Sequence, residues 1–129
     1  CKMNYMSLPF IKAKNVNFSR SDIDSSFFQE GYFENADFTG TQFTRNALEK
    51  TNLKFTNFTN ASLWSSDLTG ADLHYADFNK TNIRSTNFTD ADIRFALNFE
   101  KVIDLRNTKF RKTKMSEEQR SFLDEVQNR

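Results

Sequence analysis

Large apolar residues return at every fifth position through most of the chain. An α-helix repeats every 3.6 residues and a β-strand every 2, so a period of five lets neither element continue without interruption. The pattern therefore predicts short sides of five residues, each ending in a corner. The residues of this series are Phe18, Ile23, Phe28, Phe33, Phe38, Phe43, Leu48, Leu53, Phe58, Leu63, Leu68, Leu73, Phe78, Ile83, Phe88 and Ile93.

A small residue stands two positions before each large one. It is Ala, Ser, Thr or Gly at every step except Val16 and Asn46, and Asp or Asn usually fills the position between. We expect the large and small residues to point inward and the other positions to face water. Because one such unit cannot bury its apolar side alone, successive units must stack on one another.

A second period, of twenty residues, indicates that four sides complete one turn. Residues twenty apart then lie above one another, about 4.8 Å apart, the usual spacing of paired strands. Two sets of residues repeat in this way: the phenylalanines Phe18, Phe38, Phe58 and Phe78, and the pairs Lys54-Phe55, His74-Tyr75 and Arg94-Phe95.

The segments "ADFTG", "TNFTN", "ADLHY", "ADFNK", "TNFTD" and "ADIRF" resemble the Ala-Asp/Asn-Leu/Phe-x-x motif of the pentapeptide repeat family. The resemblance covers residues 16–95 without a break. It implies an all-β fold, a right-handed four-sided parallel β-helix.

The open ends of such a stack need cover, because exposed strand edges invite aggregation. We expect residues 1–15 to form an N-terminal cap, with Pro9 preventing strand pairing, and residues 16–114 to form the β-helix. The five-residue register breaks near 97–102, where Asn98 stands in a large apolar position, and resumes two residues late.

Residues 115–129 are predicted to form a short capping α-helix at the C-terminal end. Ser116 stands three residues before Gln119, which is an N-cap signature. Phe122, Leu123 and Val126 would share one side of this helix.

Composition narrows the function classes. The 129 residues include 18 Lys plus Arg and 17 Asp plus Glu, for a net charge of +1. Such a chain has no overall field that attracts nucleic acid, so no nucleic-acid partner is expected.

The only cysteine is Cys1, which excludes an internal disulfide. A mature bacterial lipoprotein would begin with a lipid-carrying cysteine, and Cys1 is then the predicted attachment site. That interpretation places the protein in the periplasm or envelope and gives it a membrane contact through the lipid alone. A domain cut from a longer cytoplasmic or secreted chain is the alternative, and the compartment stays open.

Catalytic motifs are not apparent in the sequence. There is no phosphate-cradling glycine loop, no paired histidine–glutamate metal motif and no nucleophile elbow, so we expect no cofactor, no metal and no enzymatic activity. Asp72 and Asp92 should lie one above the other, ~5 Å apart, which is the separation of the two catalytic carboxyl groups in a retaining glycosidase. We expect these and the other aspartates to accept hydrogen bonds from corner amides instead.

One side of the predicted rod carries outward aromatic and basic residues: Lys54, Phe55, His74, Tyr75, Arg94 and Phe95. We call this set the aromatic stripe. Trp64 and Arg84 form a secondary candidate on another side. Two interpretations of the stripe stay open. The rings either stiffen the coil while Lys54 and Arg94 pair with aspartates, or they form a docking surface, since aromatics and arginine dominate binding hot spots.

The sequence favours a non-catalytic, rigid protein-binding scaffold, monomeric or weakly dimeric. With a lipid on Cys1 it would be an envelope protein, for example one that neutralises a toxin. The family resemblance implies one alternative, a DNA mimic that protects topoisomerases from inhibitors. A polysaccharide-acting β-helix enzyme is the other.

Overall fold

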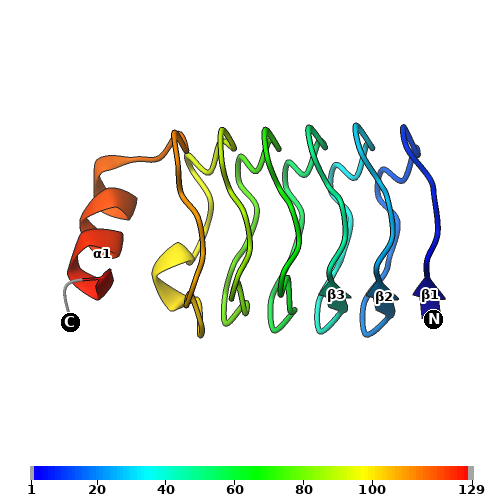
Figure 1. The fold of residues 1–129 in the computed structure, drawn as a ribbon, viewed down its shortest axis with the longest axis horizontal. Helices are drawn as coiled ribbons and strands as arrows, with labels where there is room; N and C mark the ends of the chain where they lie inside the picture. Colours follow the sequence, from blue (N-terminus) through cyan, green and yellow to red (C-terminus); the bar gives the residue numbers. More distant parts are fainter. Residues whose placement is uncertain (1, 128–129) are drawn as a thin grey trace.

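The chain winds as a rod of stacked coils in the computed structural model, which describes residues 2–127 (Figure 1). Parallel pairing joins each coil to the next, as in the series Ser7–Phe27–Ala47–Asp67. Each step in this series is twenty residues, so four five-residue sides complete one circuit. The predicted right-handed, four-sided β-helix is confirmed.

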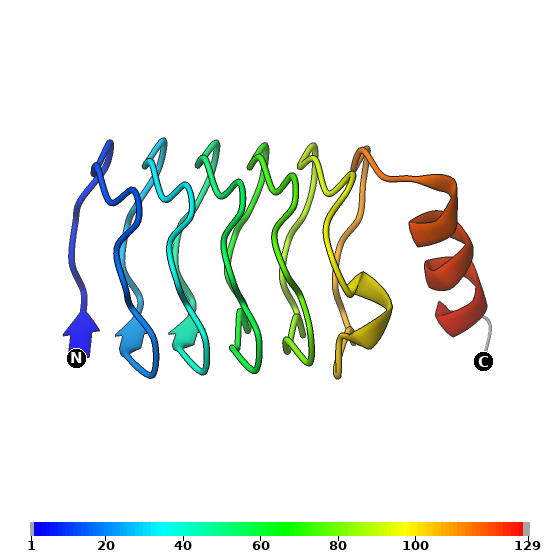
Figure 2. The same cartoon turned by 180° about the vertical axis from the view of Figure 1, so that it is seen from behind.

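Regular strands are short because a corner follows every side. Strands β1 (Lys2–Asn4), β2 (Asp22–Asp24) and β3 (Gln42–Thr44) pair in parallel in the order β1-β2-β3. Single parallel bridges join the coils on the other sides. Figure 2 shows the same stack from behind, with the coils following one another along a straight axis.

Each corner is a β-turn with a left-handed residue in its third position. At one corner the N–H of Thr56 donates to the carbonyl of Leu53 at 3.3 Å, and Phe55 has φ 60°. Only Gly40 and Gly70 are glycines among these corner residues. Left-handed backbone costs other residues roughly 1–2 kcal/mol each, so pairing and packing must offset strain at many corners.

The interior is a set of side-chain piles along the axis. Phe18, Phe38, Phe58 and Phe78 form one pile, with successive ring centroids 5.2, 5.2 and 5.7 Å apart. Phe38, Phe58 and Phe78 are fully buried. The single internal pile predicted from the twenty-residue period is therefore present.

Small inward residues also satisfy backbone groups at the corners. The hydroxyl of Thr56 donates to the carbonyl of Leu53, and that of Thr81 to the carbonyl of Phe58, each at 2.7 Å. Asn46, an exception to the small-residue rule, is buried and joins two coils. Its Nδ2 donates to the Ile23 carbonyl and its Oδ1 accepts from the Ser26 amide, both at 2.9 Å.

The prediction that residues 1–15 form an N-terminal cap is wrong for the described residues 2–15. They form the first coil of the β-helix itself, paired in parallel with the second coil through Lys2–Asn4, Ser7 and Lys12. Pro9 does not prevent this pairing. It occupies the second position of a corner turn closed by Ile11 N–H to Leu8 carbonyl at 3.3 Å, a position where proline is favoured.

The last coil contains a two-residue insertion. Asp77 pairs with Leu97, twenty residues on, but Asn82 pairs with Asp104, twenty-two residues on. The 3-10 helix η1 (Phe99–Lys101) takes up the extra length and buries Phe99. The stacked rings of Phe88 and Phe110, at 5.4 Å, show that the piles resume after it.

Helix α1 (Glu117–Gln127) covers the C-terminal end of the rod (Figures 1 and 2). The predicted cap at Ser116 is confirmed. Gln119 N–H donates to the Ser116 hydroxyl at 3.2 Å, and Ser116 N–H donates to the Gln119 amide oxygen at 2.9 Å. Gln119 Nε2 also donates to the carbonyl of Ile93 at 2.7 Å, an acceptor that the Ala96 amide shares at 3.1 Å, and this bond ties the helix to the preceding coil.

The predicted lipid attachment falls on Cys1, outside the described residues. Between residues 2 and 127, no helix is long and apolar enough to span a bilayer.

Removal of one ring from the phenylalanine pile should weaken the fold strongly. We expect Phe58→Ala to lower the free energy of unfolding by about 3–5 kcal/mol, because the stacked neighbours cannot collapse into the space. Phe27→Ala is the matched control, since Phe27 is half-exposed and Ala47 fills the same position one coil later. Urea unfolding measures both, and equal losses would contradict a core held by the pile.

The cap at Gln119 should also be measurable. Gln119→Ala removes its bonds to Ser116 and Ile93, and we expect a loss of about 1–3 kcal/mol, typical of buried groups left unsatisfied. Gln127→Ala, in the exposed last turn of α1, serves as the control. Amide hydrogen exchange should show faster exchange across α1 in the Gln119 variant alone. Unchanged exchange there would show that this side chain does not dock the helix.

Candidate functional site

The rings of the aromatic stripe form a straight ladder on one side of the rod. Phe55, Tyr75 and Phe95 occupy equivalent corners in successive coils, each with positive φ. Their ring centroids are 5.1 and 5.6 Å apart, with interplanar angles of 4° and 14°. The rings remain 51%, 45% and 61% exposed. The coil spacing therefore stacks them while leaving their edges in water.

The ladder has a defined beginning. In the two preceding coils the same corner is occupied by asparagine, and Asn35 Nδ2 donates to Asn15 Oδ1 at 2.8 Å. The column thus changes from stacked amides to stacked rings at Phe55.

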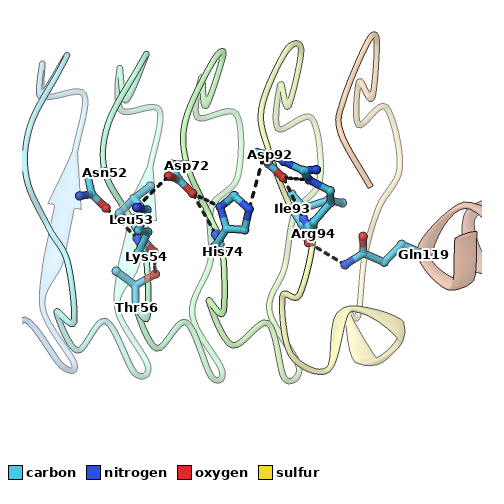
Figure 3. A network of polar contacts seen from close by, with 10 residues as sticks. All are labelled: Asn52, Leu53, Lys54, Thr56, Asp72, His74, Asp92, Ile93, Arg94 and Gln119. Atoms are coloured by element: carbon cyan, nitrogen blue, oxygen red, sulfur yellow. Dashed lines mark hydrogen bonds and ion pairs between the residues drawn. The ribbon is translucent and has the colours of Figure 1, made fainter. Parts of the chain in front are cut away.

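A row of contacts between basic side chains and aspartates runs beside the rings. His74 Nδ1 lies 2.5 Å from Asp72 Oδ1, and His74 Nε2 lies 3.4 Å from Asp92 Oδ2. Lys54 Nζ approaches Asp72 at 3.6 Å, and Arg94 contacts Asp92 through two nitrogens at 2.7 and 2.9 Å. Figure 3 shows these contacts following one another along the axis toward Gln119.

The aspartates also serve their own corners. The Oδ1 of Asp72 accepts from the His74 amide at 3.2 Å, and that of Asp92 from the Arg94 amide at 3.1 Å. The predicted role of these aspartates as acceptors of corner amides is confirmed.

The contact between Asp92 and Arg94 shifts the pKa of each group toward its charged form. Hydrogen bonds from the Arg94 guanidinium, partly opposed by burial, lower the pKa of Asp92 below its usual value, and the nearby His74 adds to this. Asp92 in turn raises the pKa of Arg94. The Asp92 carboxylate is thus held ionised beside Arg94.

The surface beside the ladder is shallow. Lys54, Phe55, His74 and Tyr75 line a hollow of about 300 Å³. The His74 ring also lies 6.1 Å from the Phe95 ring, at 26°. The six predicted residues therefore lie together on one face, with charge and aromatic surface interleaved.

Comparison with known proteins agrees with this geometry. Residues 51–90 match the family model for pentapeptide repeats, in eight copies. Residues 51–90 are therefore pentapeptide repeats, as the sequence resemblance predicts.

A solved structure similar to this pentapeptide repeat protein is Rfr23, from the cyanobacterium Cyanothece 51142. It has 15% identity and a TM-score of 0.68 over 91% of this chain and 85% of that one. At this level of identity the similarity shows the fold alone.

Two further structures resemble the chain more weakly. A protein of the Arabidopsis thaliana thylakoid lumen has 20% identity and a TM-score of 0.48 over 94% and 76% of the two chains. QnrB1, a plasmid-mediated fluoroquinolone resistance protein, has 14% identity and a TM-score of 0.28 over 100% and 98%. No protein of curated function matches the sequence.

The secondary candidates lie apart from the stripe in this pentapeptide repeat protein. Arg84 follows Trp64 by one coil, as expected, but the cation on the indole is Arg45, 5.8 Å from the ring centroid. Arg45 also forms two hydrogen bonds with Asp24. Sequence reasoning missed this Asp24–Arg45–Trp64 group, because its members come from three different coils. The sequence did contain a signal for this group: Asp24, Thr44 and Trp64 are spaced twenty residues apart and therefore lie above one another.

Within residues 2–127, no group of three or more His, Cys, Asp or Glu side chains could hold a metal ion.

The ion pairs of the stripe should make stability acid-sensitive. The pKa of Asp92 is lower in the folded than in the unfolded chain, so its contribution is complete above the ordinary value of 3.8 and is lost as pH falls through the lower folded value. Asp92→Asn should therefore flatten the acid limb of stability measured by thermal unfolding from pH 7 to 2. Asp90→Asn is the control, because Asp90 joins no ion pair with another described residue. An unchanged acid limb in Asp92→Asn would contradict the assignment.

Proposed function

We propose that this pentapeptide repeat protein is a non-catalytic, rigid scaffold that binds another protein through the aromatic stripe. The observation that carries the proposal is the ladder of three half-exposed rings, held in register by the coil spacing. Aromatic residues and arginine are enriched where binding energy concentrates in protein interfaces. Phe55, Tyr75, Phe95 and Arg94 have this character.

The corner positions of the rings support a role beyond folding. Bulky residues with left-handed backbone are uncommon, and equivalent corners elsewhere hold Gly40, Gly70, Ser65 and Ser85. The rings bury only about half of their surface within the chain, so folding gains little from their size. Burial against a partner would remove the remaining apolar surface from water.

The fixed geometry also favours binding. Each ring is stacked on a neighbour. The polar side chains of the stripe, Lys54, His74 and Arg94, each contact an aspartate carboxylate. A surface ordered in advance loses less conformational entropy on association.

Two observations favour this function over the alternatives. Asp72 contacts Lys54 and His74, and Asp92 contacts His74 and Arg94, an arrangement that favours a structural role of these carboxylates over acid–base catalysis. Beside the rings, Asp72 and Asp92 alternate with the basic side chains of the stripe, whereas a DNA mimic needs a continuous acidic surface.

A triple variant tests the proposal. Phe55→Ser, Tyr75→Ser and Phe95→Ser together should leave the rod folded, because serine already occupies the equivalent corners 65 and 85. A partner captured by the wild-type protein from cells that make it, and then purified, should bind the triple variant at least about tenfold more weakly, a loss near 1.4 kcal/mol. Calorimetry measures the affinity.

Trp64→Thr is the matched control, since it removes an exposed aromatic from a different side and Thr44 fills the same position one coil earlier. Its affinity should equal that of the wild type. Hydrogen exchange in the complex should protect amides around 54–55, 74–75 and 94–95. Equal binding by the triple variant, or protection confined to another side, would refute the stripe as the binding surface.

A further inference from the structure

The ladder ends at a cavity between the last coil and α1. We call this cavity, of about 470 Å³, the end pocket; its size falls in the range of ~300–1,000 Å³ typical of ligand sites. Three phenylalanines give it an apolar lining, and two glutamates add negative charge. The lining residues are Phe95, Ala96, Phe99, Glu100, Ser116, Glu118, Gln119 and Phe122.

Among residues 2–127, the rings that stack on Phe95 both come from the preceding coil: Tyr75 at 5.6 Å and His74 at 6.1 Å. No ring of the described residues stacks on Phe95 from the side of the last coil. In the last coil the pairing offset is twenty-two residues, as Asp92 with Lys114 shows, so the next position in the column is Glu117. Glu117 already belongs to α1, and the ladder cannot continue. The end pocket lies where the next rung would stand.

The pocket has the electrostatic character of a cation site. An aromatic face is negative, and it attracts Lys, Arg or ligand cations. Glu100, from η1, and Glu118, from the first turn of α1, are exposed and take part in no ion pair recorded for residues 2–127. Arg94, the adjacent cation of the stripe, is held by Asp92 through two hydrogen bonds and is not free to pair with them.

We propose that the end pocket binds an arginine side chain supplied by the partner protein. The planar guanidinium stacks on the free face of Phe95 as the next rung, and its N–H groups donate to Glu100 and Glu118. Arginine fits better than lysine because its planar fork can stack and form two hydrogen bonds together. This inference rests on the proposed scaffold function and names a residue that the partner contributes.

The chain itself contains a group of the same chemistry. On another side of the rod, the Arg45 guanidinium lies over the Trp64 ring while two of its nitrogens donate to Asp24. A carboxylate and an aromatic ring therefore hold a guanidinium between coils in this fold. The end pocket offers the ring and the carboxylates, and the arginine comes from outside.

Small probes test the pocket without the partner. Titration of the ¹⁵N-labelled protein with N-acetyl-arginine amide should give saturable NMR shifts at residues 95–100 and 116–122. N-acetyl-citrulline amide has the same shape without the charge and should bind at least fivefold more weakly. Glu100→Gln with Glu118→Gln should weaken arginine binding by a similar factor, and so should Phe95→Ser. Phe27→Ala, which removes a half-exposed ring outside the stripe and the pocket, should leave it unchanged.

Equal binding of arginine and citrulline, or shifts confined to other sites, would overturn the inference. The purified partner separates it from the proposed function. If the Glu100→Gln, Glu118→Gln variant binds the partner as tightly as wild type while the triple serine variant does not, the arginine site falls and the scaffold stands. If the triple variant keeps full affinity while the arginine probe binds the wild-type end pocket, the scaffold proposal and the partner as the source of the arginine both fall, and only the affinity of the pocket for arginine stands.

Discussion

The structure depends on one constraint, the fixed distance between paired coils. Parallel pairing places residues twenty apart at the strand spacing of about 4.8 Å, which is close to the contact distance of stacked aromatic rings. The same spacing therefore produces the buried phenylalanine pile from Phe18 to Phe78 and the exposed ladder from Phe55 to Phe95. Interior and surface are ordered by one geometric rule.

That rule requires a corner after every five residues, and the corners are strained. Left-handed backbone is held at phenylalanine, tyrosine and lysine positions that glycine would fill more easily. Local hydrogen bonds offset this strain. Backbone amides donate to the aspartate or asparagine side-chain oxygen two residues earlier, and threonine hydroxyls donate to turn carbonyls. The polar residues of the repeat therefore stabilise the corners as directly as the apolar residues fill the interior.

The two-residue insertion in the last coil gives this rod its individual features. It shifts the pairing offset, places η1 beside the stack and brings Glu117, the first residue of α1, to the next position of the ladder column. The stripe consequently ends in a cavity with a free aromatic face rather than in another coil. In the proposed function, the rod binds its partner through a surface along one side and a pocket at its end.

The sequence by itself determined the four-sided β-helix, the Phe18–Phe78 pile, the Ser116 cap and the composition of the stripe. It could do so because each depends on a regular spacing or a local signal. The first coil was misread as a cap because Pro9 and the apolar Met6, Ile11 and Val16 hide the five-residue pattern there. Only the tertiary structure decided that His74 bridges two aspartates, that Arg45 rather than Arg84 covers Trp64, and that Phe95 faces a pocket. These contacts depend on side-chain rotamers and on where the helix leaves the stack, which a linear period does not specify.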